Sequence, residues 1–272
     1  NNNKIECDIV IAYKPLDYKD FSNVKLPKCI RYNEMYDFNW TVQEIEESNA
    51  DLVICHHENE MKTYKAFYSN YHGQRNTNVQ FVHIPHCAKS EVFKDYKLEK
   101  KYDILVCGRL GNRNSLGDFH YPLRDRIIKN ILPKLPKKYN YHLHKHPGYN
   151  HVDSWTDKYL IDMAKEVNAS KICITCSGLP KTRFGKYIEI PMCNSVIAGD
   201  IPDEDSDNFK NFVIELNMKM GDKQILKKIV HYLDCDRKLN NLKNIGYEWS
   251  QKYTQEFYAQ KLFETIKNFL QK

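Results

Sequence analysis

The sequence lacks the features that mark membrane-spanning and disulfide-stabilised proteins. No apolar run in its 272 residues approaches the ~18–20 residues of a membrane-spanning helix, and no signal peptide precedes the first strand-like segment. The nine cysteines are an odd number scattered along the chain, and several lie inside apolar runs, where cysteine behaves as a small buried hydrophobic residue. This usage predicts a reducing compartment, the cytoplasm, and argues against a disulfide framework and a cysteine-based zinc site.

The chain also lacks the basic stripe that a nucleic-acid-binding surface requires. Lys and Arg total 41 against 35 Asp and Glu, but they alternate with acids almost everywhere, apart from a short cluster at Lys134, Lys137 and Lys138. The net charge of +6 suits an anionic ligand, and equally a mildly basic soluble protein. Hydrophobic residues make up 42 % of the chain, enough for a sizeable core, so wholesale disorder is excluded and nucleic acid is not an expected partner.

Two phosphate-binding fingerprints are absent as well. The loop at 108–113 follows a strand-like run and precedes a helix, but it has neither the Gly-Lys-Ser/Thr ending of a Walker loop nor G-x-G-x-x-G spacing. Gly108 still allows a ligand to approach the backbone closely, and Arg109 and Arg113 can each hold a phosphate through two hydrogen bonds. The loop is therefore a candidate anion site, with an ordinary surface turn as the alternative.

What is present is an alternation of short apolar runs with amphipathic stretches, the pattern of α/β architecture. The expected strands are 7–12, 51–55 and 80–84 and, after a polar connector at 89–101, 102–107, 139–144, 171–176, 195–198 and 212–216. The expected helices are 41–48, 122–132, 157–167, 186–192, 222–233 and a long one from 236 that is broken near Gly246 and Thr254. Open parallel sheets bind ligands beyond the carboxyl ends of their strands, so we expect the chemistry in the loops there.

The richest segment in functional residue types is the run at 177–189. It combines a strand end, small residues, three cations and then a carboxylate on a helix; its candidates are Ser177, Lys181, Thr182, Arg183, Lys186, Tyr187 and Glu189. A sugar nucleotide needs cations or backbone amides for its diphosphate and a carboxylate for its ribose hydroxyls. The alternative is that the cations are simply solvated.

This run, the strand Tyr-Asp-Ile-Leu-Val-Cys-Gly at 102–108 and the strand at 195–200 resemble the C-terminal domain of GT-B glycosyltransferases. The greatest similarity is to the spore-maturation-type group with its family-1-like C-terminal domain, with a weaker similarity to exostosin-type domains. Lys186 and Glu189 match a basic residue and a Glu three positions later in that group, and Asn194 stands where a glycine is usual. The passage from His83 to Phe93 and the tail around Trp249 also resemble it, so the resemblance covers about residues 80–265.

The resemblance implies roles for individual residues. Glu189 would hold the donor ribose, as does the second Glu of the retaining GT-B pair, but the first position of that pair is Lys181 here, which leaves the stereochemical outcome open. Arg183 and Lys186 would neutralise the diphosphate leaving group electrostatically, as a metal does in GT-A enzymes. Gly108 and Arg109 would lie under the donor phosphates or sugar, and His146 would flank the nucleobase.

The first half of the chain resembles no family closely enough to transfer roles. His57 and Glu58 follow the strand at 51–55, and either could be the general base that an inverting transferase needs near its acceptor hydroxyl. A polar loop that starts a helix is an equal alternative. Asp17, after the first strand, is the second choice for the base, and His86 is the third.

Asp-x-Asp triplets hold a metal in GT-A transferases, and this chain has them at 203–205, 205–207 and 234–236. None follows a central strand of the first domain. We therefore expect the acids at 200–207 to be solvated loop residues, and we expect no metal site and no cofactor beyond the nucleotide sugar.

Together these features predict an α/β protein of the GT-B type, in which two Rossmann-like domains face a cleft. An acceptor domain at 1–98 and a donor domain at 99–251 would be followed by a helix at 252–272 that packs back on the first domain. The predicted activity is transfer of a sugar from a nucleotide diphosphate, expected to be a UDP-sugar, to a hydroxyl of a glycan or related acceptor. The short first domain predicts a longer multidomain chain or a minimal version such as a large virus would encode. A sugar-nucleotide epimerase and a non-catalytic glycan- or nucleic-acid-binding module are the alternatives.

Overall fold

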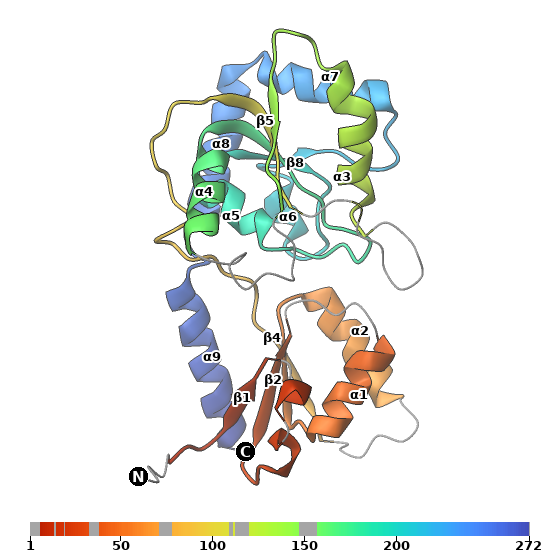
Figure 1. The fold of residues 1–272 in the computed structure, drawn as a ribbon, viewed down its shortest axis with the longest axis vertical. Coiled ribbons are helices and arrows are strands. Elements are labelled where there is room, and N and C mark those ends of the chain that lie inside the picture. The colour runs from red at the N-terminus through yellow and green to blue at the C-terminus, as the bar shows by residue number, and fades with distance from the viewer. Residues whose placement is uncertain are drawn as a thin grey trace. The chain divides into compact units, whose positions relative to one another are not determined.

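The computed structural model describes residues 6–13, 15–18, 20–32, 38–70, 78–108, 111, 120–146 and 157–271. The chain divides into two compact units: unit 1 comprises Asn1–Pro85 and Tyr258–Lys272, and unit 2 comprises His86–Phe257. Each unit is built on its own parallel β-sheet with helices packed against it (Figure 1). The two α/β units confirm the fold class expected from the sequence.

Unit 1 is a four-stranded sheet with helices on both faces. Its strands are β1 (Val10–Ala12), β2 (Lys28–Tyr32), β3 (Leu52–Cys55) and β4 (Gln80–His83), in that spatial order and all parallel. Helices α1 (Phe38–Ser48) and α2 (Glu58–Ser69) cover the face that carries Ile30 and Val53, and α9 (Gln255–Leu270) covers the face that carries Cys29 and Ile54. Alternate strand residues therefore face opposite layers, as the two-residue period of a strand requires.

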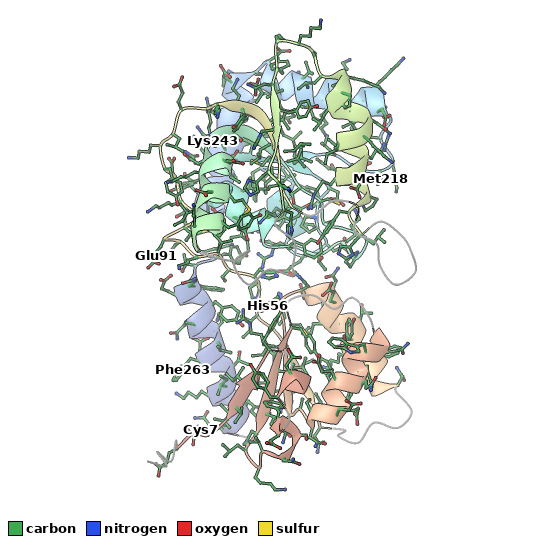
Figure 2. All side chains as sticks on the ribbon, in the orientation of Figure 1. Cys7, His56, Glu91, Met218, Lys243 and Phe263 are labelled. Carbon is green, nitrogen blue, oxygen red and sulfur yellow. The ribbon has the colours of Figure 1, made fainter. Side chains whose placement is uncertain are left out.

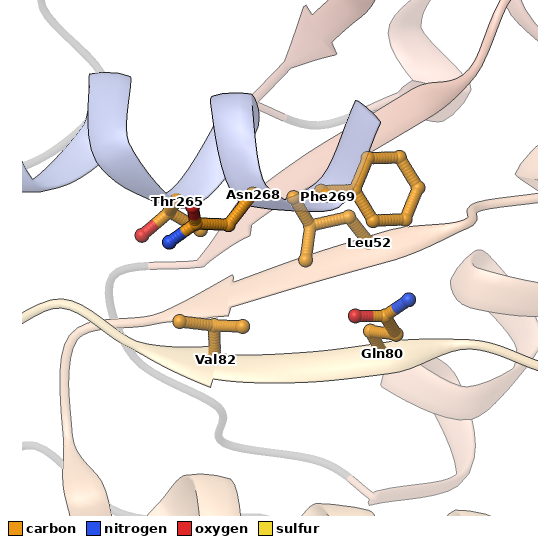
Figure 3. A pocket seen from close by; sticks show the side chains of 6 residues that line it. All are labelled: Leu52, Gln80, Val82, Thr265, Asn268 and Phe269. Carbon is orange, nitrogen blue, oxygen red and sulfur yellow. The ribbon is translucent and has the colours of Figure 1, made fainter. Parts of the chain in front are cut away.

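A small hollow lies between α9 and the first sheet (Figure 3). Leu52, Gln80 and Val82 line it from the strands, and Thr265, Asn268 and Phe269 line it from the helix. Leu52 and Gln80 are the first residues of β3 and β4, so the hollow extends to the amino ends of the strands. Ligands of parallel sheets bind at the opposite edge.

The strand β2 was not among the strands expected from the sequence. Its apolar residues are interrupted by Lys28 and Arg31, which hide the run of hydrophobic residues that a central strand usually shows. The Lys28 side chain nevertheless has a partner in the fold, because its Nζ donates to the carbonyl oxygen of Val24 at 3.0 Å. The Arg31 Nε donates to the ring of His56 at 3.0 Å. Tertiary partners thus permit two cations in a strand that the sequence pattern alone would reject.

Unit 2 is a five-stranded parallel sheet with the spatial order β6-β5-β7-β8-β9. The strands are β5 (Tyr102–Val106), β6 (Tyr141–Leu143), β7 (Ser170–Ile174), β8 (Val196–Gly199) and β9 (Ile214–Glu215). The helices are α3 (Pro122–Arg126), which continues as a π turn over Ile127–Ile131, α4 (Asp157–Asn168), α5 (Lys186–Met192), α6 (Ser206–Phe209), α7 (Asp222–Leu233) and α8 (Asp236–Ser250). Apolar residues of α4 and α5 pack on one face of the sheet, those of α3, its π turn and α7 pack on the other, and α8 contributes apolar residues to both clusters. Among the residues described, no helix combines the length and the apolar composition that crossing a bilayer would require.

The connector that precedes β5 belongs structurally to unit 2. Its Val92 and Phe93 are buried in the same core cluster as α4 and α5. Its Asp95 accepts hydrogen bonds from the side-chain amides of Asn168 and Asn194, both at 2.9 Å. The two units therefore divide at Pro85, ahead of the position near 98 expected from the change in composition. Asn194 has a φ of +55°, the left-handed conformation that glycine adopts most easily and that asparagine tolerates.

Gly246 lies inside a continuous helix and does not break it. Helix α8 runs without interruption to Ser250, and Gly246 is buried. A β-carbon at this position would come within 3.0 Å of the Phe212 ring and 3.3 Å of Pro191. The glycine is therefore required by close packing of α8 on its neighbours, and only the expected break near Thr254 is present, between α8 and α9.

The glycine that ends β8 yields a test of the packing in unit 2. A β-carbon on Gly199 would lie 2.3 Å from the backbone oxygen of Thr175, and neither strand end can move without disturbing the sheet. Gly199→Ala should lower the free energy of unfolding by about 2–3 kcal/mol or more, the cost of overpacking a core. The matched control is Gly221→Ala, where the nearest atom would be 3.7 Å away. Gly221 is the N-cap of α7, where alanine is less favourable than glycine, so denaturant unfolding should place this variant within about 1 kcal/mol of wild type. Equal stabilities of the two variants would contradict the packing described.

A second test concerns Lys100, whose Nζ donates to the carbonyl oxygens of Asn168 at 2.6 Å and Asn194 at 3.0 Å. Burial lowers the pKa of Lys100 from 10.5 to about 8. Between these two pH values the unfolded chain binds one proton more than the folded chain, so this group makes stability rise with pH. Relative to Lys100→Met, the wild type should gain about 1–3 kcal/mol of unfolding free energy between pH 8 and 10.5. Chemical denaturation across this range measures the difference, and parallel profiles of the two proteins would refute the assignment.

Candidate functional site

The strand order of unit 2 determines where a ligand site is expected. β5 is the first strand of this sheet in the sequence, and it pairs with β6 on one side and with β7 on the other. From β5 the strand order therefore continues in two opposite directions. In open α/β sheets such a reversal of strand order is the topological switch point, and ligands bind there beyond the carboxyl ends of the strands. The residues that follow these strands are Cys107 and Gly108 after β5, His144 after β6, and Thr175 to Gly185 after β7.

The loop after β7 is organised by the carboxylate of Asp200, the residue after β8. Its Oδ1 accepts from the Ser177 backbone N at 2.8 Å, and its Oδ2 accepts from Ser177 Oγ and from Lys181 Nζ, both at 2.7 Å. The Tyr187 hydroxyl donates to the Asp200 backbone oxygen at 2.5 Å and lies 3.3 Å from its Oδ1. Burial, and then the Asp200 charge, raise the pKa of Tyr187. Asp200 therefore connects β7, β8 and α5 at the carboxyl edge.

Arg183 lies in the interior of unit 2 and does not face solvent. Its side chain is 1 % exposed and pairs with Glu204 at 2.7 Å. The guanidinium lies 4.4 Å from the centre of the Tyr253 ring, a cation–π contact. Since both charges are buried and in contact, this pair is part of the core packing.

Lys186 and Glu189 form an ion pair in the first turn of α5. Both side chains are about one-fifth exposed, so the pair is neither solvated nor sealed in the core. Burial lowers the pKa of Lys186, but the charge and hydrogen bond of Glu189 together with Cys107 and Tyr159 act in the opposite direction, and the net pKa is raised. The pair supplies a half-buried cation and a half-buried anion in adjacent positions.

Gly108, two residues after β5, has a backbone conformation that needs glycine, with a φ of +105°. A β-carbon on Gly108 would lie 2.5 Å from Nη1 of Arg124, a buried residue of α3. The Arg124 guanidinium also lies 4.3 Å from the centre of the Tyr121 ring. A second buried cation, not singled out in the sequence, is thus present at the end of β5. Arg124 lies in the first turn of the helix that follows the loop after β5, and this position is the sequence signal that could have identified it.

Histidines and a carboxylate meet at the end of β6. The ring of His144 contacts Glu166 of α4, with Nδ1 2.7 Å from Oε2, and His142 Nε2 lies 3.2 Å from the same oxygen. The ring of His144 also lies 5.2 Å from that of Tyr159. Neither His144 nor Glu166 was among the expected site residues, because their separation of 22 positions carries no local motif.

The predicted donor-site residues are therefore distributed as follows. Those at or just beyond the carboxyl ends of β5, β6 and β7, or on the first turn of α5, are Gly108, His146, Ser177, Lys181, Thr182, Lys186, Tyr187 and Glu189. Ser177, Thr182 and Tyr187 are buried and support the loop, whereas the Lys181 side chain is 44 % exposed. Arg183 is buried, and Arg109 and Arg113 lie outside the described residues.

The expectation that the acids at 200–207 are solvated is wrong for two of them. Asp200 and Glu204 are buried, and each pairs with a cation of the loop after β7. Asp205 accepts a hydrogen bond from the indole nitrogen of Trp249 at 3.0 Å. The sequence shows only a cluster of acids in a loop, whereas their partners lie in other segments. Across the described part of the chain, no three His, Cys, Asp or Glu side chains lie together as potential metal ligands.

Cys173 and Cys176 have the Cys-x-x-Cys spacing of redox motifs, which was absent from the expectations above. Both are buried free thiols. Burial raises the pKa of Cys173 and raises that of Cys176 to about 11. A reactive cysteine needs a lowered pKa and access to solvent, so these two are structural.

In unit 1 the candidate bases occupy different environments. His57 is fully buried at the start of α2, Glu58 is partly exposed and pairs with Lys62 at 2.6 Å, and Asp17 is exposed on a short 3-10 helix after β1.

His56, the residue before His57, is labelled in Figure 2. Its Nδ1 lies 2.9 Å from the Ile84 carbonyl oxygen, and its Nε2 accepts from Arg31, so it links β2, β3 and the end of β4.

Comparison with known proteins identifies the fold. No protein-family model matches the sequence, and no curated protein matches it. Sucrose-phosphate synthase from Thermosynechococcus elongatus is a solved structure with 12 % identity and a TM-score of 0.62, covering 96 % of this chain and 73 % of its own. HepE of Anabaena in complex with UDP-glucose has 10 % identity and a TM-score of 0.66, and the match covers 90 % of this chain and 73 % of the HepE chain. TarM has 14 % identity and a TM-score of 0.61, covering 94 % of this chain and 54 % of its own. This chain therefore has the GT-B fold of glycosyltransferases.

Proposed function

We propose that the protein is a glycosyltransferase that transfers a sugar from a nucleotide diphosphate donor, a UDP-sugar, to a hydroxyl of a glycan or related acceptor. The observation that carries this proposal is the half-buried Lys186–Glu189 pair on the first turn of α5 in the donor unit. Among solved structures with the same fold, HepE has been obtained with UDP and with UDP-glucose, and the pneumococcal O-GlcNAc transferase GtfA with UDP and GlcNAc.

In this proposal Lys186 and Glu189 contact different parts of the donor when it binds. Glu189 accepts hydrogen bonds from the ribose hydroxyls, and the Lys186 ammonium turns to the diphosphate, whose negative charge grows as the glycosidic bond breaks. Lys181, with its more exposed ammonium, is a second cation that the phosphates or the sugar can reach. Fixed cations would then supply the stabilisation that a metal ion supplies in other transferases, so we propose that the reaction is independent of metal ions. Arg183 is left out of the phosphate site because its guanidinium is buried against Glu204.

The acceptor hydroxyl needs a base, and unit 1 supplies the candidates. Glu58 and Asp17 are accessible carboxylates after β3 and β1, and His57 is a buried imidazole beside the first of them. We propose Glu58 or Asp17 as the base and His57 as a supporting residue. Most of the nine free cysteines are buried, which supports the proposal that the enzyme works in the cytoplasm.

The donor site can be tested by ligand-induced stabilisation. UDP should raise the melting temperature of the wild type, with or without EDTA, because a ligand of the folded state adds about 2.7 kcal/mol at 100 times its Kd. Glu189→Gln should weaken UDP about 10- to 100-fold, since hydrogen bonds to a charged group contribute about 1.5–3 kcal/mol. The control is Glu248→Gln, an exposed glutamate of α8, which should bind UDP as the wild type does.

Two results would count against the proposal. The donor-site assignment fails if neither UDP nor GDP, ADP or CMP stabilises the wild type at millimolar concentration, and a non-catalytic binding module then becomes the better reading. Metal independence fails if EDTA abolishes the stabilisation and a divalent cation restores it.

A further inference from the structure

His144, the first residue after β6, is held so that only one of its ring nitrogens is available. Its backbone N donates to the Val106 carbonyl oxygen at 2.9 Å, which fixes it beside the end of β5. Its Nδ1 lies 2.7 Å from Oε2 of Glu166. An ionised carboxylate can only accept hydrogen bonds, so Nδ1 carries the proton, and in the neutral ring Nε2 is an acceptor.

The Nε2 of His144 has no hydrogen-bond partner among the described residues, although it is buried. The side chain as a whole is 10 % exposed. A buried acceptor without a partner costs about 1–3 kcal/mol, and such an atom in a native structure calls for an explanation. His142 differs in this respect, because its Nε2 faces Glu166 and its ring stacks on Tyr102 with 4.7 Å between centroids.

Tyr159 relates this acceptor to the Lys186–Glu189 pair. The Tyr159 ring lies 5.2 Å from that of His144. Burial raises the pKa of Tyr159 to about 12, against the opposing effect of the Lys186 charge. His144 follows β6 and the Lys186–Glu189 pair follows β7, and both strands pair with β5, so these side chains belong to the same carboxyl edge of the sheet.

We propose that His144 Nε2 accepts a hydrogen bond from the nucleobase of the donor, from N3–H of uracil, and that Glu166 is the residue that positions it. This inference rests on the function proposed above. Next to a ribose held by Glu189, a nucleotide offers its phosphates and its base. Phosphate oxygens only accept hydrogen bonds, so an imidazole acceptor cannot bind them, whereas the uracil imide presents an N–H flanked by two carbonyl oxygens. His144 thus contributes to selection of the base.

The test compares UDP with N3-methyl-UDP, which lacks this N–H, by calorimetric titration of three proteins. The wild type should bind N3-methyl-UDP about tenfold or more weakly, the equivalent of one net hydrogen bond. His144→Asn places an amide where Nδ1 stands, keeping a donor for Glu166 but removing the acceptor, so UDP should bind about tenfold more weakly and the preference over N3-methyl-UDP should disappear. His144→Gln places an amide where Nε2 stands and should keep most of the preference. His231→Asn, at an exposed histidine of α7, is the control and should change neither affinity.

Nitrogen NMR of labelled protein gives a second readout that a merely structural role would not change. His144 should appear as the Nδ1–H tautomer, and UDP but not N3-methyl-UDP should shift its Nε2 resonance. If UDP binds and is preferred over N3-methyl-UDP, yet His144→Asn retains that preference, the inference is overturned and the donor site stands. If UDP does not bind the wild type, both the inference and the choice of a UDP-sugar as donor are overturned.

Discussion

The carboxyl edge of unit 2 depends on one buried carboxylate. Asp200 directly follows β8, and its carboxylate accepts hydrogen bonds from the backbone N–H and the hydroxyl of Ser177 and from the ammonium of Lys181. A buried carboxylate is tolerated only when donors surround it, and a loop that supplies those donors is in turn fixed by them. The loop after β7 leads directly into α5, so the position of Lys186 and Glu189 follows from an interaction in which neither takes part.

Much of the architecture could be predicted from local pattern, because a parallel sheet buried on both faces repeats short apolar runs between amphipathic helices. All five strands of unit 2 overlap expected runs, and β2 of unit 1 was missed because its two cations find partners only in the folded chain. Gly246 was expected to break a helix, since backbone propensity is visible in a sequence but the ring of Phe212 against that glycine is not.

The candidate site was predictable as a set of residue types and not as a set of contacts. The run after β7 offers three cations, and each has a carboxylate partner in the structure: Lys181 with Asp200, Arg183 with Glu204, and Lys186 with Glu189. Only the last pair is close in sequence, so only it could be anticipated from helical spacing. The burial of each cation could not be predicted from the sequence either, since Arg183 is buried and Lys181 is not. His144 and Glu166 carry no motif and became recognisable only from hydrogen-bond geometry.

Unit 1 is discontinuous in sequence, and this has a consequence for biosynthesis. The sheet face that carries Cys29, Leu52 and Ile54 is covered by Tyr258, Leu262 and Phe269 of α9, which leave the ribosome after all of unit 2. Until then the nascent first unit has an apolar face without its cover, whereas unit 2 already contains all of its own sheet and can fold first. Exposed apolar surface on a growing chain favours aggregation and chaperone binding. Residues Tyr258–Lys272 thus set the time at which Asn1–Pro85 can complete their fold.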